Sequence, residues 1–151
     1  MNGNLRNSRL FYFLNIIIPL AIGLILYLSL RKDSYVSLLA NTIIHLPNIP
    51  EQKLPTGLVA FLRNFASDIL WAYALTFAVE CVLGYNKKSL LLHILICVCF
   101  VVLIELVQKI GIFNGTFDLL DILFEGFSIC LAIQIIKKHE EAQNEKNRKN
   151  T

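Results

Sequence analysis

An uncharged run of 21 residues near the N-terminus constrains this chain more than any other feature. The run extends from Leu10 to Leu30 and is closed by Arg31, Lys32 and Asp33. About 20 predominantly apolar residues are what a helix needs to cross the hydrocarbon core of a bilayer. The whole chain of 151 residues is 56% hydrophobic and only 17% charged, which is more apolar than a soluble domain of this length. The sequence therefore predicts an integral membrane protein, with the first span kept as an uncleaved anchor.

Three further apolar segments follow the first span. They cover residues 58–83, 90–108 and 117–136, so the predicted fold is all-α: a single transmembrane bundle of four helices within residues 10–136. The connections between the last three spans are short, which makes these spans neighbours that alternate in direction. Residues 1–9 precede the bundle, and the polar tail 137–151 is expected to be solvated and frayed.

The distribution of basic residues predicts the orientation in the membrane. One side receives Arg6, Arg9, Lys87, Lys88, Lys137, Lys138, Lys146, Arg148 and Lys149, and the other only Arg31, Lys32, Lys53 and Lys109. Because cytoplasmic ends carry more Lys and Arg, both termini are expected in the cytoplasm, an N-in/C-in arrangement. Apolar residues at helical spacing within 33–57 predict a short interfacial helix on the outer surface, where His45 is expected to be an interfacial polar residue.

Polar side chains within the last three spans are expected to meet at one end of the bundle. Because these spans alternate in direction, the start of the second, the end of the third and the start of the fourth share one depth. Ionisable groups inside a membrane are costly and usually functional, so the set predicts an outward-facing acidic cleft that binds a ligand. The alternative is that these groups only hold the helices together. The set comprises Arg63, Asn64, Asp68, Glu105, Gln108, Asp118, Asp121 and Glu125.

The remaining polar and sulfur-containing residues predict no metal, cofactor or catalytic centre. Glu80 lies near Lys87 and Lys88 and is expected to be an interfacial counter-charge, while His93 is expected to lie far from the acids of the cleft. The four cysteines fall in apolar stretches and are expected to act as small buried hydrophobic residues. The chain has no recognisable catalytic motif, and its basic residues form no stripe suited to nucleic acid.

The order of the polar residues resembles that of a known family. The stretches FLRNFASDILWAYAL, IELVQ and GTFDLLDILFEGFS are similar to the VanZ-like family of small bacterial membrane proteins, over about residues 58–136. The resemblance implies a multi-pass protein of the bacterial cytoplasmic membrane, associated with tolerance to teicoplanin-type glycopeptide antibiotics and with a lipid-linked or glycopeptide ligand of the envelope. At Glu125 and Gly126 the chain departs from the pattern, which more usually has a neutral polar residue followed by a later glycine. The positions that match are Arg63, Asp68, Glu105, Gln108, Asp118 and Asp121.

Two other functions fit the same residues. In a small transporter, Glu105, Asp121 and Glu125 would carry protons or cations while access alternates around the cleft. In a membrane-embedded lipid hydrolase or transferase, one acid would act as a base and Arg63 would bind phosphate. The sequence shows no nucleophile for such an enzyme. The transporter predicts ion-dependent flux, and the enzyme predicts turnover of a lipid substrate.

Overall fold

The computed structural model describes residues 2–30, 56–110 and 118–149 of the chain. Over these ranges the elements are α1 (Asn2–Leu30), α3 (Thr56–Phe61), the π-helix η2 (Leu62–Ala66), α4 (Ser67–Leu83), α5 (Leu90–Lys109) and α6 (Leu119–Lys149). Every element is helical, which confirms the all-α prediction for this part of the chain. The stretches Ser8–Ser29, Gly57–Leu83, Leu90–Lys109 and Leu119–Lys149 are long and apolar enough to cross a membrane, so the four predicted spans are confirmed.

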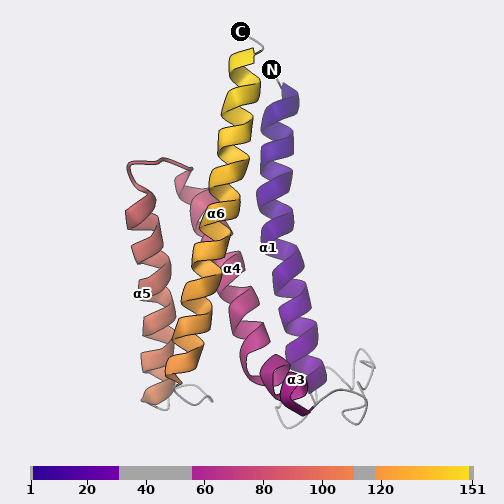
Figure 1. Ribbon diagram of the computed structural model, residues 1–151, viewed down its shortest axis with the longest axis vertical. Helices are drawn as coiled ribbons and strands as arrows, with labels where there is room; N and C mark the ends of the chain where they lie inside the picture. Colours follow the sequence, from indigo (N-terminus) through magenta and orange to yellow (C-terminus); the bar gives the residue numbers. More distant parts are fainter. Residues whose placement is uncertain (1, 31–55, 111–117, 150–151) are drawn as a thin grey trace.

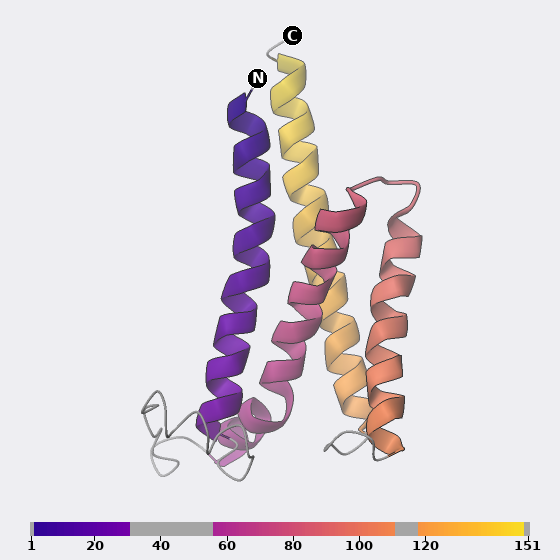
Figure 2. The same cartoon turned by 180° about the vertical axis from the view of Figure 1, so that it is seen from behind.

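Helix α4 lies at the centre of the bundle (Figure 1). It packs against α1 on one side and against α5 and α6 on the other, and α5 also contacts α6. The last three spans are therefore neighbours, as predicted. Both chain termini lie at the same end of the molecule, which we call the terminal end (Figure 2). We call the opposite end, where α5 finishes and α6 starts, the acid end.

The buried core is small, and large apolar side chains cover the outside. One buried cluster joins α4, α5 and α6, and a second joins α1, α4 and α6 near the terminal end. Leu91 and Leu103 on α5 are exposed, as are Ile18 on α1 and Phe127 on α6. In a bilayer such side chains contact hydrocarbon, so their exposure has little cost there. The outer faces of these helices are therefore suited to contact with lipid.

Helix α1 comes close to α4 at Gly23. A Cβ atom at this glycine would lie 3.5 Å from the Leu70 Cβ and 3.6 Å from the Ser67 carbonyl oxygen. Small residues at a helix interface allow two backbones to approach in this way, which is the main source of packing energy between membrane helices. The contact holds α1 against the first turns of α4, next to Asp68.

The polar tail is helical, so the expectation of a frayed tail is wrong for residues 137–149. Helix α6 continues to Lys149 because α1 provides partners beyond the apolar stretch. The Tyr12 hydroxyl donates a hydrogen bond to Glu140 Oε1 at 2.9 Å, and the Phe11 ring stacks on the His139 ring with centroids 3.7 Å apart. These contacts hold the two helices side by side at the terminal end (Figure 2).

The predicted interfacial helix and His45 lie outside the described residues. Only the last part of that segment is described, where Thr56 and Gly57 begin α3.

Candidate functional site

The chain approaches the acid end through a π-helical turn. Element η2 contains Arg63 and Asn64, and Asp68 follows in the first turn of α4. Turns of this kind are rare and frequently occur at functional sites. Because their hydrogen bonds join residues five apart, a spacing of four across η2 does not place two side chains on one face. Asn64 is accordingly exposed, whereas Asp68 is half-buried.

Five carboxyl groups from three helices gather at the acid end. Glu105 on α5 and Glu125 on α6 are buried, with 4% and 5% of their surface exposed. The charges of Asp68, Glu105 and Asp121 act on Glu125, and those of Asp68 and Asp118 act on Glu105. We call these five residues the acid cluster. The structure thus brings together most of the polar residues that the sequence placed at one end.

Asp118 and Asp121 lie where α6 begins. The Asp118 carboxylate accepts a hydrogen bond from the Leu120 backbone N–H at 2.9 Å, as residues that cap helix N-termini do. The Asp118 backbone N–H in turn donates to Glu105 Oε2 at 3.4 Å. Asp121 occupies the first turn, where the helix dipole favours a negative charge. The start of α6 therefore holds two acids of the cluster beside the end of α5.

The three other predicted site residues lie on η2 and α5. Gln108 is half-buried and lies one turn beyond Glu105 on α5, and Asn64 is exposed. Arg63 is placed within η2, and its side chain lies outside the described part of the structure.

A cavity of about 280 Å³ adjoins Asp68 in the seam between α1 and α4. It is lined by Gly23 and Tyr27 of α1 and by Ser67, Asp68 and Trp71 of α4, among others. The Ser67 hydroxyl donates a hydrogen bond to Asp68 Oδ1 at 3.3 Å. An acid between two aromatic side chains suits a cationic group, because aromatic faces and carboxylates both attract positive charge. Trp71 thus forms part of the wall of this cavity.

A second, larger cavity of about 380 Å³ lies between α1, α4 and α6. Its polar side chains are bonded within the protein: the Tyr73 hydroxyl donates to Asn15 Oδ1 at 2.8 Å, and the Ser128 hydroxyl donates to the Ile69 carbonyl at 2.7 Å. Leucine, isoleucine, proline and phenylalanine side chains form the rest of the lining. The cavity therefore offers a mainly apolar surface in the membrane-spanning part of the bundle.

Glu125 has the most demanding environment in the acid cluster. Its Oε2 atom is buried and has no hydrogen-bond partner among the described residues. A buried carboxylate without partners is costly, and three other acids repel its charge. Binding a proton or a cationic group removes this penalty. Within the described residues, no group of three or more His, Cys, Asp or Glu residues is arranged to hold a metal ion.

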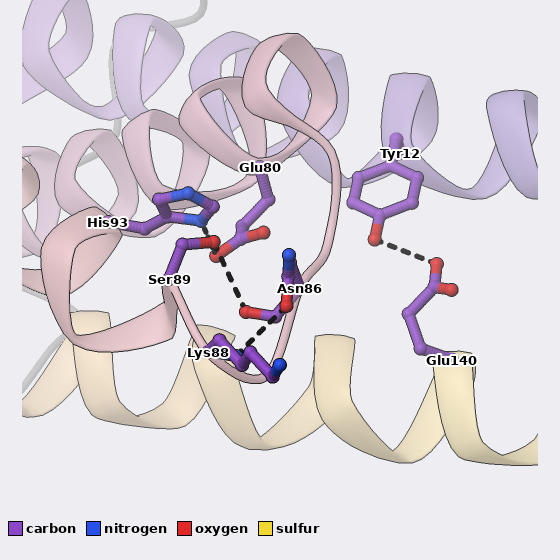
Figure 3. A network of polar contacts seen from close by, with 7 residues as sticks. All are labelled: Tyr12, Glu80, Asn86, Lys88, Ser89, His93 and Glu140. Atoms are coloured by element: carbon purple, nitrogen blue, oxygen red, sulfur yellow. Dashed lines mark hydrogen bonds and ion pairs between the residues drawn. The ribbon is translucent and has the colours of Figure 1, made fainter.

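A second polar centre lies at the terminal end, between α4 and α5 (Figure 3). Glu80 and His93 are 1% and 4% exposed, and Glu80 Oε1 lies 2.9 Å from His93 Nδ1. The expectation that Glu80 is an interfacial counter-charge is wrong, because its carboxyl group is turned into the bundle. Lys87 pairs instead with Glu141 of α6, at 3.3 Å. The sequence does contain a sign of this pairing. Glu80 lies four residues before the connection 84–89 and His93 lies four residues after it, so a tight hairpin places the two side chains at the same level.

The connection between α4 and α5 fixes this pair. Gly84 ends α4 with a φ of 77°, which favours glycine, and its N–H donates to the Glu80 carbonyl at 2.9 Å. The Asn86 side chain then accepts a hydrogen bond from the Lys88 N–H at 2.9 Å, and the Asn86 carbonyl accepts one from the Ser89 hydroxyl at 3.3 Å (Figure 3). This turn starts α5 at Leu90, three residues before His93.

The chain matches no protein-family model, no curated protein and no solved structure among those with which it was compared.

Proposed function

We propose that the chain is a VanZ-like integral membrane protein of the bacterial cytoplasmic membrane. In this proposal the termini are cytoplasmic, and the acid cluster faces outward and binds a cationic group of an envelope ligand, lipid-linked or glycopeptide. The supporting observation is the gathering of five carboxyl groups around the buried Glu105 and Glu125. Inserting a charged side chain at the middle of a membrane costs about 2.5 to 3.5 kcal/mol. Ionisable residues in membrane spans are therefore rare, and a group of them favours a functional role.

The surroundings of Asp68 support a cationic ligand. This acid borders the smaller cavity together with Tyr27 and Trp71, and its charge also acts on Glu105 and Glu125. Electrostatic attraction is stronger where water is scarce, so a positively charged group entering the cavity would be drawn towards the cluster. Neutralising one acid should weaken this attraction without changing the shape of the cavity.

The test is protection against a teicoplanin-type antibiotic in a host that expresses the protein. Wild type is compared with Asp68→Asn, Glu105→Gln and Asp121→Asn, and membrane levels are checked by blot. Glu145→Gln is the matched control, because Glu145 is exposed near the C-terminus, away from the acid end. We expect protection by wild type and the control and its loss in the cluster variants. Equal protection by all forms at equal abundance would overturn the proposed role of the cluster.

A second candidate function is a small proton- or cation-coupled transporter. It is favoured by Glu125, whose buried Oε2 atom has no hydrogen-bond partner in the described part of the chain. Buried carboxyl groups that gain and lose a proton are the usual carriers in membrane pumps and transporters. In proteoliposomes containing a pH-sensitive dye, wild type should show flux driven by a potassium diffusion potential, and Glu125→Gln should not. Equal flux in the two proteins would exclude this role for Glu125.

A further inference from the structure

A stripe of residues on α4 and α5 runs from their connection, where the two helices are close, to the acid end, where α6 lies between them (Figure 2). Each step of four residues along α4 meets a step of four along α5 in the opposite direction, so the stripe winds around each helix by about 40° per step. Three contacts join residues of the stripe: a hydrogen bond between Glu80 and His93, an interaction between the Thr76 side chain and the Cys97 thiol, and an apolar cluster that contains Ala72 and Val101. At the acid end, the charges of Asp68 and Glu105 influence each other. In order from the acid end, the stripe holds Asp68 and Glu105, Ala72 and Val101, Thr76 and Cys97, and Glu80 and His93, of which the last two pairs interact directly.

The stripe has polar groups at both ends and in one inner layer. Thr76 and Cys97 are fully buried, and the Thr76 hydroxyl donates to the Ala72 carbonyl at 2.9 Å. The only layer whose side chains are all apolar is formed by Ala72 and Val101, against which Ile129 of α6 packs. Asp68 and Glu80 are separated along α4 by about 18 Å, since a helix rises about 1.5 Å per residue. The stripe therefore connects the two polar centres through most of the apolar part of the bundle.

The Glu80–His93 pair is chemically suited to take up and release a proton. A carboxyl group and an imidazole 2.9 Å apart can each bind a proton and can pass one between them. Glu80 Oε2 is a further buried acceptor without a hydrogen-bond partner among the described residues. Glu80 interacts electrostatically with Tyr12 of α1, Tyr85 of the connection and Cys97 of α5. The charged or titratable groups that act on these two tyrosines are Cys81, Lys87, Glu140 and Glu141.

We propose that Glu80 and His93 form the proton-exchange site at the terminal end, and that protons move between this site and the acid cluster along the stripe. The inference rests on the second candidate function, proton movement through Glu125. A proton leaves the Glu125 carboxyl group, whose oxygen keeps the bonding electron pair, and transient water carries it past the Ala72 and Val101 layer. A lone pair of Glu80 or His93 accepts it, and the pair returns one proton to water at the terminal end. Charge and atoms are conserved at each transfer.

The experiment is proton flux in proteoliposomes containing full-length protein and a pH-sensitive dye, under a potassium diffusion potential. Glu80→Gln and His93→Asn remove the exchange site, and the exposed Glu145→Gln is the matched control. Val101→Thr changes little in shape and adds a hydroxyl group to the apolar layer, where it can bond to its own helix as Thr76 does. We expect Glu80→Gln and His93→Asn to lower the flux about 100-fold, the smaller end of what a positioned proton-transfer group contributes. We expect Val101→Thr to raise it.

The outcomes separate this inference from the function on which it rests. If Glu125→Gln abolishes flux while Glu80→Gln and His93→Asn conduct like wild type, the transporter stands and the exchange site is wrong. If correctly inserted wild type conducts no protons, both are wrong. Size-exclusion chromatography and thermal melting check that each variant is folded. If Glu80→Gln does not fold, Val101→Thr still tests the proton route, because unchanged proton flux in that variant refutes movement along the stripe.

Discussion

The Glu80–His93 bond should stabilise the bundle more than any exposed ion pair in the chain. Both side chains are excluded from water, so removing one leaves the other buried without its partner. Interhelical hydrogen bonds in membrane proteins contribute about 0.6 kcal/mol on average and about 1.7 at most. Hydrogen bonds to charged groups contribute about 1.5 to 3 kcal/mol. We therefore expect a coupling energy of about 1.5 kcal/mol, where the two ranges meet.

A double-mutant cycle measures this coupling energy directly. Glu80→Ala, His93→Ala and the double variant are unfolded reversibly in mixed micelles by increasing the fraction of denaturing detergent. The Lys87–Glu141 pair is the matched comparison, because it joins α6 to the same connection but its side chains are 67% and 45% exposed. Its coupling should stay below about 0.5 kcal/mol. A Glu80–His93 coupling no larger than that of Lys87–Glu141 would refute the reasoning that burial strengthens the bond.

Three further predictions concern the terminal end. Gly84→Ala should lower the free energy of unfolding by about 1 kcal/mol in the same detergent assay, because only glycine adopts its φ without strain; unchanged stability would contradict this. Burial raises the pKa of Tyr85 above its ordinary value of 10.0, so the folded protein keeps a proton that the unfolded chain releases. The free energy of unfolding should therefore fall as the pH rises above 10.0, and it should fall less steeply in Tyr85→Phe than in wild type. Equal pH dependence of unfolding in the two proteins would contradict this role of Tyr85. Tyr12→Phe removes the hydrogen bond to Glu140 and should speed amide exchange in residues 137–149, whereas equal protection would show that the bond does not order the tail.

The spans were predictable because their length and apolar composition are properties of the sequence alone. The convergence of Asp68, Glu105 and Glu125 was equally accessible, since it requires only that three neighbouring helices alternate in direction. The arrangement that brings these acids together did not depend on which side of the membrane they face. The order and direction of the helices therefore suffice to place these acids at one end of the bundle.

Features that depend on which faces meet were not predictable in the same way. The π-helical turn at Leu62–Ala66 has no compositional signal, and it moves Asn64 away from the face of Asp68. Glu80 was assigned to the interface from its distance to the loop, but its burial depends on the rotation of α4 about its own axis. The tail has the composition of a solvated segment, yet contacts with aromatic residues of α1 order it. In each case a tertiary contact overrides the local pattern.

The matched steps along α4 and α5 restrict how the length of this protein can change. One residue added to α4 between Asp68 and Glu80 would rotate one end of the stripe by about 100° relative to the other. Glu80 would then turn towards hydrocarbon, and His93 would face an apolar residue. A residue added in the connection 84–89 leaves the spacing within both helices unchanged. Insertions and deletions should therefore be tolerated in the connections, whereas within these two helices only a change of about seven residues, two helical turns, made in both helices at the same level keeps the opposed residues together.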